Sequence, residues 1–419
     1  LGSLEGLAAL GTDSIPLEEG VRRFLELFTK DPGDRQVIVT GRLGGIDTWR
    51  PEFPALPKGT RFLEDIRFFQ PGVELVARSH LTLERDAYLL DHEYESSYLF
   101  PTVFGVEAMA QAVAYVLGRP DIGCVTINGL ELPRPLPVHA ERGLGVEISA
   151  RVLETRSGVI NVLTSVRCEQ TGYSVDHFSA TFALGVQSAP TKAGDLLDLR
   201  GSSLKSMSPQ EQLYGPILFQ GPRFQRIQGV RHLDSRCCGF ESEEREAHDW
   251  VLGDPFASDA LLQSLQLCAL PDQCLPVHVN RWHIADARLN AMRSRENQAT
   301  ITAHTEDAYV GDVVSSDDGG SVLEEISGYR AKILKRRDDW PTAEEFADGS
   351  FRQNSREETL EWSTSAAYQT IEGAGPQGQP LFIFRFPLAF KDSATPMNSL
   401  YFNSFAEWMG RARELAGMG

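Results

Sequence analysis

Two pairs of polar residues stand four positions apart within otherwise apolar segments. Glu107 and Gln111 lie in TVFGVEAMAQAVAYVLG, and Asp259 and Gln263 lie in DPFASDALLQSLQLCAL. Side chains four positions apart project from one helix face, so each acid is expected beside its amide. Each pair accompanies an apolar stripe that predicts a helix packed on a core. The same arrangement occurring twice indicates a duplicated unit.

His92 is the third group that could carry chemistry. It follows the short apolar strand YLL and precedes Pro101, where a helix is expected to begin. A histidine at a strand end, aimed across a helix N-terminus, is suited to moving a proton near neutral pH. Taken alone, such a histidine is more often a hydrogen-bonded structural residue.

These segments together resemble one family. His92-x-x-x-Ser96-x-x-x-x-Pro101 resembles the HxxxGxxxxP motif of dehydratase domains in polyketide and polyunsaturated fatty-acid synthases, with serine in place of glycine. Asp259-x-x-x-Gln263 resembles their DxxxQ motif, and LPVHVNRW resembles the strand that follows it. The resemblance covers roughly residues 62–336.

A third motif lies between these two. Tyr214-Gly215-Pro216 resembles the YGPxF segment of the same domains, with Phe219 one position late. The helix that carries Glu107 is also similar to that of stand-alone β-hydroxyacyl carrier-protein dehydratases, which are homodimers of the hot-dog fold. The resemblance therefore implies an α+β fold, a double hot dog in which two fused units each wrap a long helix in an antiparallel sheet.

The resemblance implies a reaction and its residues. A β-hydroxyacyl thioester on an acyl carrier protein would lose water to give an α,β-enoyl thioester, with His92 as base, Asp259 as acid and Gln263 orienting the hydroxyl or the carboxyl. The substrate-binding residues are expected to be Pro101, Gly105, Tyr214, Gly215 and Pro216. Backbone N–H groups near Gly105, at the helix start, are expected to stabilise the charge that develops on the thioester carbonyl.

Glu107 and Gln111 would face a second site related by pseudo-symmetry, near His248, with a structural glutamate as the more frequent alternative for a buried acid. His177, His278 and His283 lie in predicted strands and are expected to be structural. The resemblance implies no cofactor and no metal.

The acid role creates an electrostatic conflict at Asp259. The residue lies in the first turns of its helix, where the helix dipole lowers a carboxyl pKa. A general acid must keep its proton, so burial has to raise the pKa by more than the dipole lowers it. The neighbouring apolar residues Phe256, Leu262 and Leu265 predict such burial.

Other functions use the same fold. A double-bond isomerase or a product-template domain that directs cyclisation would employ the same residues. A non-catalytic acyl-binding scaffold belongs to a different class, but it requires none of His92, Asp259 and Gln263.

Composition limits the partners. The chain of 419 residues holds 40 Lys and Arg against 58 Asp and Glu, a net charge of -18, which disfavours nucleic acid and anionic membranes. No apolar stretch is long enough to span a bilayer. An acidic carrier protein with its phosphopantetheine arm would need a local basic patch, with Arg223, Arg226 and Arg281 as candidates. The expected location is the cytoplasm, and a homodimer is left open.

Polar and Pro/Gly-rich stretches predict the domain organisation. The chain starts at Leu1 without a secretion signal, and its six cysteines form no CxxC pair, so we expect a fragment of a longer cytoplasmic synthase whose other domains are further partners. The expected pieces are a ketoreductase-like remnant (1–47), a linker (48–61), the first hot dog (62–187), a linker (188–210), the second hot dog (211–336), a linker (337–358) and a partial thioesterase-like hot-dog segment (359–419).

Overall fold

The fold was analysed in a computed structural model. It describes residues 15, 17–30, 60–119, 122–156, 158–185, 205, 208–242, 250–285, 295–317, 319–337, 340–348, 369–374 and 380–383. Among these residues, no helix is both long and apolar enough to cross a membrane.

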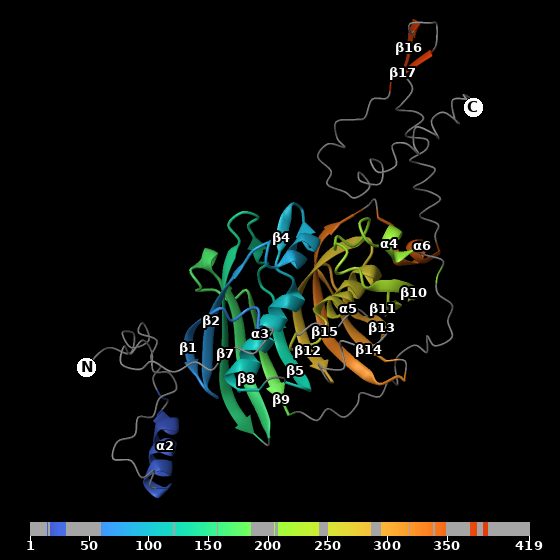
Figure 1. Cartoon of the computed structure of the whole chain (residues 1–419). Helices are drawn as coiled ribbons and strands as arrows, with labels where there is room; N and C mark the ends of the chain where they lie inside the picture. The colour runs from blue at the N-terminus through green and yellow to red at the C-terminus, as the bar shows by residue number, and fades with distance from the viewer. Residues whose placement is uncertain are drawn as a thin grey trace.

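One antiparallel sheet of 12 strands runs through the molecule (Figure 1). The first half of its strand order is β1 (Asp65–Gln70), β2 (Glu74–Leu81), β7 (Leu144–Arg156), β8 (Val159–Cys168), β9 (Phe178–Leu184) and β5 (Val125–Glu131). The second half is β12 (Asp272–Ile284), β15 (Val322–Arg336), β14 (Ala308–Ser316), β13 (Arg295–His304), β11 (Cys237–Ser242) and β10 (Ile227–Leu233). Strands β5 and β12 pair at the centre, where Ile127 lies opposite Trp282, and this pairing joins two similar halves.

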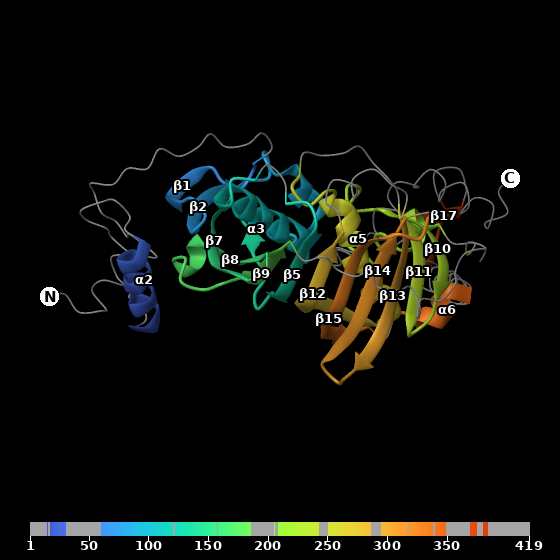
Figure 2. The same ribbon diagram turned by 90° about the horizontal axis from the view of Figure 1, so that it is seen from below.

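Each half encloses one long helix on the same side of the sheet (Figure 2). Helix α3 (Thr102–Val116) is buried at every position from Val103 onward, and α5 (Pro255–Cys268) is buried at all positions except Gln266. The predicted single apolar stripe is therefore wrong for α3, because the sheet and the second half cover the helix on all sides. Asp254 followed by Pro255 predicts a helix start with aspartate as the N-cap, and this is confirmed for α5, since the Asp254 side chain accepts a hydrogen bond from the N–H of Phe256 at 2.9 Å.

The double hot-dog prediction is confirmed by this architecture. Alternating apolar residues predict most of the strands, including one over YSVDHFSATFAL, but strand β9 begins only at Phe178, after the short helix η2 (Glu169–Thr171) and a turn. Strands β1, β5 and β11 and the short strands Glu93–Tyr94, Ser97–Leu99 and Pro137–Val138 were not predicted from the sequence. The predicted strand YLL is wrong, because it is part of the short helix η1 (Ala87–Asp91). Helix α6 (Ala343–Asp348) lies in the expected 337–358 linker, yet Ala343 is fully buried against the second half.

The terminal segments are only partly described. Helix α2 (Leu17–Lys30) forms where the sequence predicts a helix, and strands β16 (Gln369–Ala374) and β17 (Pro380–Ile383) pair in the C-terminal segment. The predicted strand RQVIVTGR and the thioesterase-like run from Phe384 onward lie outside the described residues. The ketoreductase-like and thioesterase-like assignments therefore stay predictions.

A short hairpin beside His92 explains the glycine of the family motif. Strands β3 (Glu93–Tyr94) and β4 (Ser97–Leu99) are joined by Glu95 and Ser96, with φ of 47° and 62°. Two-residue turns with positive φ at both positions favour Asn-Gly, because only glycine adopts this conformation without a steric cost. Ser96 thus occupies the motif's glycine position in a backbone conformation that suits glycine better.

We predict that Ser96→Gly raises the free energy of unfolding by about 1 kcal/mol, because it removes the cost of a left-handed residue with a side chain. Ser97→Gly is the matched control. It places glycine in strand β4 and should lower stability by roughly 0.5–1 kcal/mol. Urea denaturation of both variants measures the difference, and a Ser96→Gly variant no more stable than wild type would contradict the prediction.

Candidate active site

His92 is held at the end of a short helix with one ring nitrogen facing the interior. It caps η1 (Ala87–Asp91), and its Nδ1 lies 2.9 Å from the carbonyl oxygen of Leu99. A carbonyl oxygen only accepts hydrogen bonds, so Nδ1 must carry the proton and Nε2 keeps its lone pair in the neutral ring. The reciprocal bond from the N–H of Leu99 to the carbonyl of His92, at 3.1 Å, fixes the segment.

Aromatic rings from the second half enclose the imidazole. The ring of Phe219 packs edge-on against His92 at 4.9 Å between centroids, and the ring of Phe224 lies 5.3 Å away. Burial in this apolar setting lowers the pKa of His92 to about 4, against the opposing effect of its backbone hydrogen bonds. The imidazole is therefore neutral at neutral pH and available as a base.

Asp259 lies in α5 with 5% of its surface exposed. Its Oδ2 accepts a hydrogen bond of 2.7 Å from the side-chain amide of Gln263, one turn further along the helix. Burial raises the pKa of Asp259 to about 7, although the amide bond lowers it. The direction of this shift agrees with the expected effect of burial, and Phe256, Leu262 and Leu265 are all buried as predicted.

Gln263 is itself held in one orientation. The Tyr214 hydroxyl donates to Gln263 Oε1 at 3.1 Å and accepts from the N–H of Ile227 at 3.0 Å. Burial raises the pKa of Tyr214, so the phenol keeps its proton. Gln263 Nε2 also donates to the carbonyl of Phe224 at 3.3 Å. Because Oε1 must face the phenol, the amide hydrogens face Asp259.

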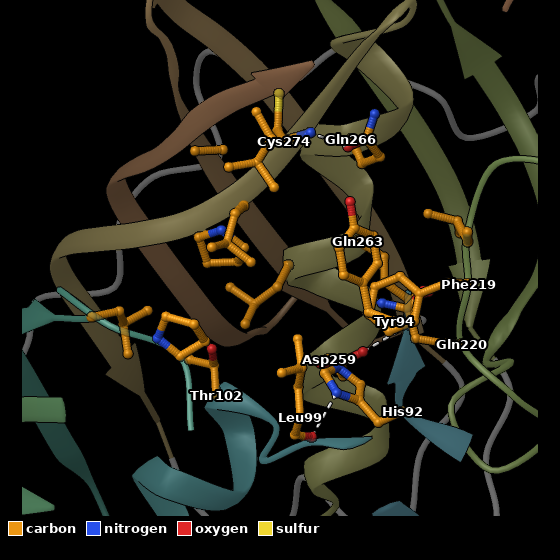
Figure 3. A pocket seen from close by; sticks show the side chains of 18 of the residues that line it. His92, Tyr94, Leu99, Thr102, Phe219, Gln220, Asp259, Gln263, Gln266 and Cys274 are labelled. Carbon is orange, nitrogen blue, oxygen red and sulfur yellow. Dashed lines mark hydrogen bonds between the residues drawn. The ribbon is translucent and has the colours of Figure 1, made fainter. Parts of the chain in front are cut away.

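His92 and Asp259 face each other in one cavity between the two halves (Figure 3). Gln266 and Cys274 lie toward its opposite end. The remaining lining is mostly apolar and includes Leu99, Phe100, Leu132, Phe178, Ile217, Leu218, Leu262, Leu275, Pro276 and Leu334. Such a cavity suits an acyl chain, with the two proton-transfer groups at one position along it.

The predicted substrate-binding residues are neighbours of the lining rather than part of it. The described cavity is lined by Phe100, Thr102, Ile217 and Leu218, whereas Pro101, Gly105, Tyr214, Gly215 and Pro216 are outside it. Gly105 has a packing role. A Cβ atom on Gly105 would come within 2.1 Å of the Phe178 ring, so glycine is required for this ring to form the cavity wall.

The expected carbonyl-binding donor also needs correction. The N–H of Gly105 already donates to the carbonyl of Pro101 at 3.0 Å. The first N–H groups of a helix have no acceptor within it, so the available donors at the start of α3 are those of Thr102 and Val103. Thr102 lines the cavity, so this helix end faces the site.

Glu107 and Gln111 occupy the equivalent place in the first half but contact protein. The Glu107 carboxylate accepts hydrogen bonds from Gln111 Nε2 at 2.9 Å, from the N–H of Val251 at 2.8 Å and from the N–H of Leu252 at 2.9 Å. Burial raises the pKa of Glu107 to about 7 against these three donors. Trp250 beside them stacks on Phe62, so chain from the second half covers this carboxylate. His248 lies outside the described residues.

The three other histidines considered from the sequence form hydrogen bonds within the protein. His278 Nδ1 lies 2.9 Å from Glu131, His283 Nδ1 lies 2.9 Å from the Thr126 hydroxyl, and His177 Nε2 lies 3.3 Å from the Cys168 sulfur. Sequence reasoning missed Phe224, which contacts both His92 and Gln263. No local signal marks it in the sequence, because Phe224 stands between Arg223 and Gln225, beyond the apolar run of residues 217–219.

We predict opposite effects on stability when the two buried carboxyl groups become amides. The pKa of Asp259 is about 7 in the folded chain and about 3.9 when unfolded, so wild type loses stability as pH rises from about 4 to 7. Asp259→Asn removes this loss, and its advantage over wild type should grow across that window and then level off. Glu107→Gln leaves at least one buried N–H unpaired and should cost about 1–3 kcal/mol at pH 4, where the Glu107 carboxyl, whose pKa is also about 7, holds its proton and no buried charge offsets the loss. Thermal unfolding from pH 4 to 8 tests both; equal effects of the two changes would contradict the assignment.

Comparison with known families identifies the domain. Residues 68–164 match the polyketide synthase dehydratase domain, and residues 192–339 match the polyketide synthase dehydratase N-terminal domain. The two matches together span more than half of the chain. No curated protein sequence matches this chain.

Solved structures show the same fold. The dehydratase domain from the CurF module of curacin polyketide synthase is 18% identical, with a TM-score of 0.52, over 67% of this chain and 100% of that one. The domain from the CurK module is 20% identical, with a TM-score of 0.53, over 66% and 99%. A variant of the PpsC dehydratase domain from Mycobacterium tuberculosis is 19% identical, with a TM-score of 0.50, over 66% and 99%. With both halves of the domain matched in order, the chain belongs to the polyketide synthase dehydratase family.

Proposed function

We propose that the domain removes water from a β-hydroxyacyl thioester carried on an acyl carrier protein, with His92 as the base and Asp259 as the acid. The observation that carries this proposal is that the two groups face each other with opposite protonation preferences. Burial favours the proton-free imidazole and the protonated carboxyl, so both are ready for elimination at the same pH.

The chemistry balances with these two groups. The Cα–H bond breaks and its proton passes to Nε2 of His92, while its electrons form the Cα–Cβ double bond. The β-hydroxyl leaves with the proton of Asp259, so the products are an enoyl thioester and one water. The imidazolium then returns a proton to the Asp259 carboxylate, directly or through solvent, and restores both groups.

Gln263 determines which carboxyl oxygen acts. Its amide donates to Oδ2 of Asp259, which therefore accepts and cannot hold a proton toward that donor. The acidic proton is left on Oδ1. Negative charge on the thioester carbonyl would be stabilised by the first N–H groups of α3, at Thr102 and Val103.

Inactive variants of a similar protein support this assignment. Two solved CurK dehydratase structures are of inactive variants, one with a histidine changed to phenylalanine and the other with an aspartate changed to asparagine. These are the two residue types that face each other here. Both structures are 19% identical to this chain over 66% of it.

We predict that kcat/KM is bell-shaped with pH, with limbs near pH 4 and pH 7. Activity requires neutral His92, whose pKa is about 4, and protonated Asp259, whose pKa is about 7. Rates fall below the first value because the base is protonated, and above the second because the acid has lost its proton. Initial rates with an N-acetylcysteamine thioester measure the profile. A rate that climbs steadily from pH 7 to 9 would contradict these protonation states.

We predict that His92→Ala and Asp259→Asn each lower kcat at least 10²-fold while the domain stays folded, because each removes a proton-transfer group. Mass spectrometry of the thioester also separates the alternatives. Loss of one water identifies dehydration, unchanged mass with a shifted spectrum identifies an isomerase, and no change identifies a scaffold. Wild-type turnover by either folded variant would refute the assignment.

The carrier protein is proposed to dock on basic residues at the cavity rim. Arg134 lines the cavity, and Lys335 and Lys332 pair with the lining residues Gln273 and Leu275. All three cations are exposed, and none takes part in an ion pair among the described residues. The patch expected from the sequence is corrected, because Arg226 is buried beside Asp254, while Arg223 and Arg281 pair with Asp91 and Glu325.

We predict that the double change Arg134→Glu and Lys335→Glu raises KM for a carrier-bound substrate about tenfold, the effect of about 1.4 kcal/mol of lost attraction. KM for the N-acetylcysteamine thioester should not change. Arg236→Glu is the control, because it reverses the charge of an exposed residue in the turn between β10 and β11. Equal effects on both substrates would contradict carrier docking at this rim.

The assembly, oligomeric state and location of the domain follow less directly from the site. A domain of this family works within a multidomain synthase on a carrier-bound substrate. A homodimer and a cytoplasmic location stay predictions from the sequence. Light scattering of the purified chain, which has a monomer mass of 46.4 kDa, tests whether it forms a dimer.

A further inference from the structure

We infer that the ion pair between Asp91 and Arg223 is a positioning device that holds His92 against the loop of residues 217–224 and so keeps the imidazole dry and aligned with Asp259. The inference rests on the proposed roles of His92 and Asp259. It concerns two residues outside the motifs discussed above, one from each half of the domain.

Asp91 immediately precedes His92 and is bound to the loop through both its side chain and its backbone. Its Oδ2 lies 2.6 Å from Arg223 Nη1 and accepts from the N–H of Arg223 at 3.3 Å. Its carbonyl oxygen accepts from the N–H of Gly221 at 2.8 Å. Arg223 Nη1 also donates to the carbonyl of Ala87, at the start of η1, at 3.1 Å. One guanidinium therefore contacts both ends of the helix that presents His92.

The backbones approach so closely that the loop requires glycine. A Cβ atom on Gly221 would lie 2.5 Å from Asp91 Oδ1 and 2.9 Å from Asp91 Cα. Real Cβ atoms do not approach other atoms this closely, so the contact excludes every larger residue at this position. The loop is thus fitted to the residue beside the catalytic histidine.

The same loop contacts both proton-transfer groups. Phe219 and Phe224 pack on the His92 ring, and the Phe224 carbonyl accepts from Gln263, which holds Asp259. Phe219 is 38% exposed and lies between the imidazole and solvent. If the loop moves away from Asp91, water reaches His92 and the geometry of both groups is disturbed.

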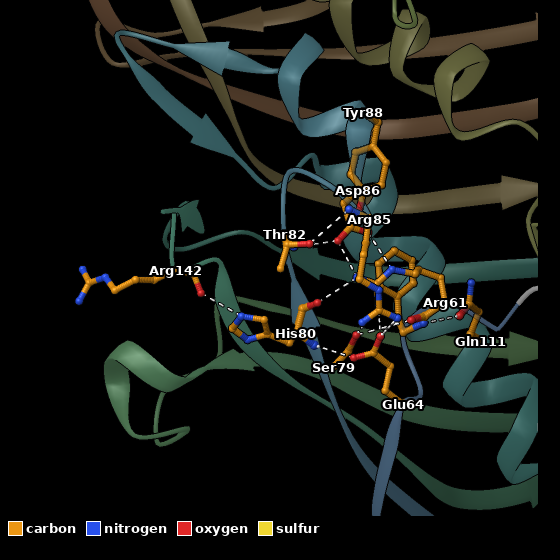
Figure 4. A network of polar contacts seen from close by, with 11 residues as sticks. Arg61, Glu64, Ser79, His80, Thr82, Arg85, Asp86, Tyr88, Gln111 and Arg142 are labelled. Atoms are coloured by element: carbon orange, nitrogen blue, oxygen red, sulfur yellow. Dashed lines mark hydrogen bonds and ion pairs between the residues drawn. The ribbon is translucent and has the colours of Figure 1, made fainter. Parts of the chain in front are cut away.

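The opposite end of η1 is held in a different way. Asp86 binds Arg61 at 2.9 Å and 2.6 Å and accepts from the N–H of Thr82 at 3.0 Å, and Arg61 also donates to Ser79 at 2.8 Å (Figure 4). The Asp86 side chain is fully buried, and all of these residues belong to the first half. This network fixes η1 to its own half, whereas Asp91 and Arg223 fix it to the other half.

The expected consequence is on catalysis rather than on folding. The Arg223 side chain is 47% exposed, and exposed ion pairs contribute little to stability. A displacement of about 1 Å at a catalytic group, in contrast, can cost roughly 10²-fold in rate. The titratable groups that share the described cavity with His92 are Tyr94, Arg134, Asp259, Cys274 and Tyr329, and none of them is altered by a change at Arg223.

The test compares Arg223→Gln and Asp91→Asn with wild type, using the N-acetylcysteamine thioester so that carrier docking plays no part. We expect kcat to fall roughly 10- to 100-fold with little change in KM. The acid limb of kcat/KM should move from near pH 4 toward pH 6.5, because water that reaches the imidazole stabilises its charged form. Arg223→Lys, which keeps the charge near Asp91, should recover part of the rate.

Two further measurements make the outcomes decisive. Arg330→Gln breaks an ion pair with Asp307 in which the arginine is similarly exposed, at 45%, and should leave kcat and the acid limb unchanged. An NMR titration of the His92 ring reports its pKa in wild type and in Arg223→Gln without requiring turnover. A pKa that does not rise in the variant, or a kcat equal to that of wild type, overturns the inference. Failure of wild type to release water from the thioester would instead refute the proposed function.

Discussion

Removal of water from one cavity is the constraint on which the site depends. An imidazole and a carboxyl in water are both charged near pH 5, and such a pair cannot start an elimination. Burial reverses both preferences, because each group then favours its neutral form. The cavity is therefore part of the catalytic apparatus, and the elements that keep it dry matter as much as the two side chains.

The fold excludes water from this cavity by joining two hot-dog halves. Each half wraps a helix that is buried along almost its whole length, and the central pairing of β5 and β12 places the two helices in one continuous core. His92 comes from the first half and Asp259 from the second, so neither half holds a complete site. The duplicated acid–amide pair has diverged: Asp259 and Gln263 face the cavity, while Glu107 is occupied by backbone N–H groups of the second half.

The sequence predicts the long helices and most strands from local patterns, and its resemblance to dehydratase domains supplied the residues of the site. The four-residue spacing of Asp259 and Gln263 and the Asp254-Pro255 start are read directly from the chain. It could not predict that α3 is buried on all sides, since this depends on a sheet formed by distant strands. For the same reason it assigned Tyr214 to the substrate rather than to Gln263, and Arg226 to the surface rather than to a buried ion pair. The contact of Asp91 with Gly221 and Arg223 joins segments 130 or more residues apart and has no local signal.

The central claim is that Asp259 holds a proton where an ordinary aspartate has none. An infrared difference spectrum between wild type and Asp259→Asn reports this directly, because Glu107 and all other carboxyl groups cancel. The account predicts the carbonyl band of a protonated carboxylic acid at pH 6, which disappears as the pH rises through about 7. A spectrum that shows only the carboxylate at pH 6 would contradict it.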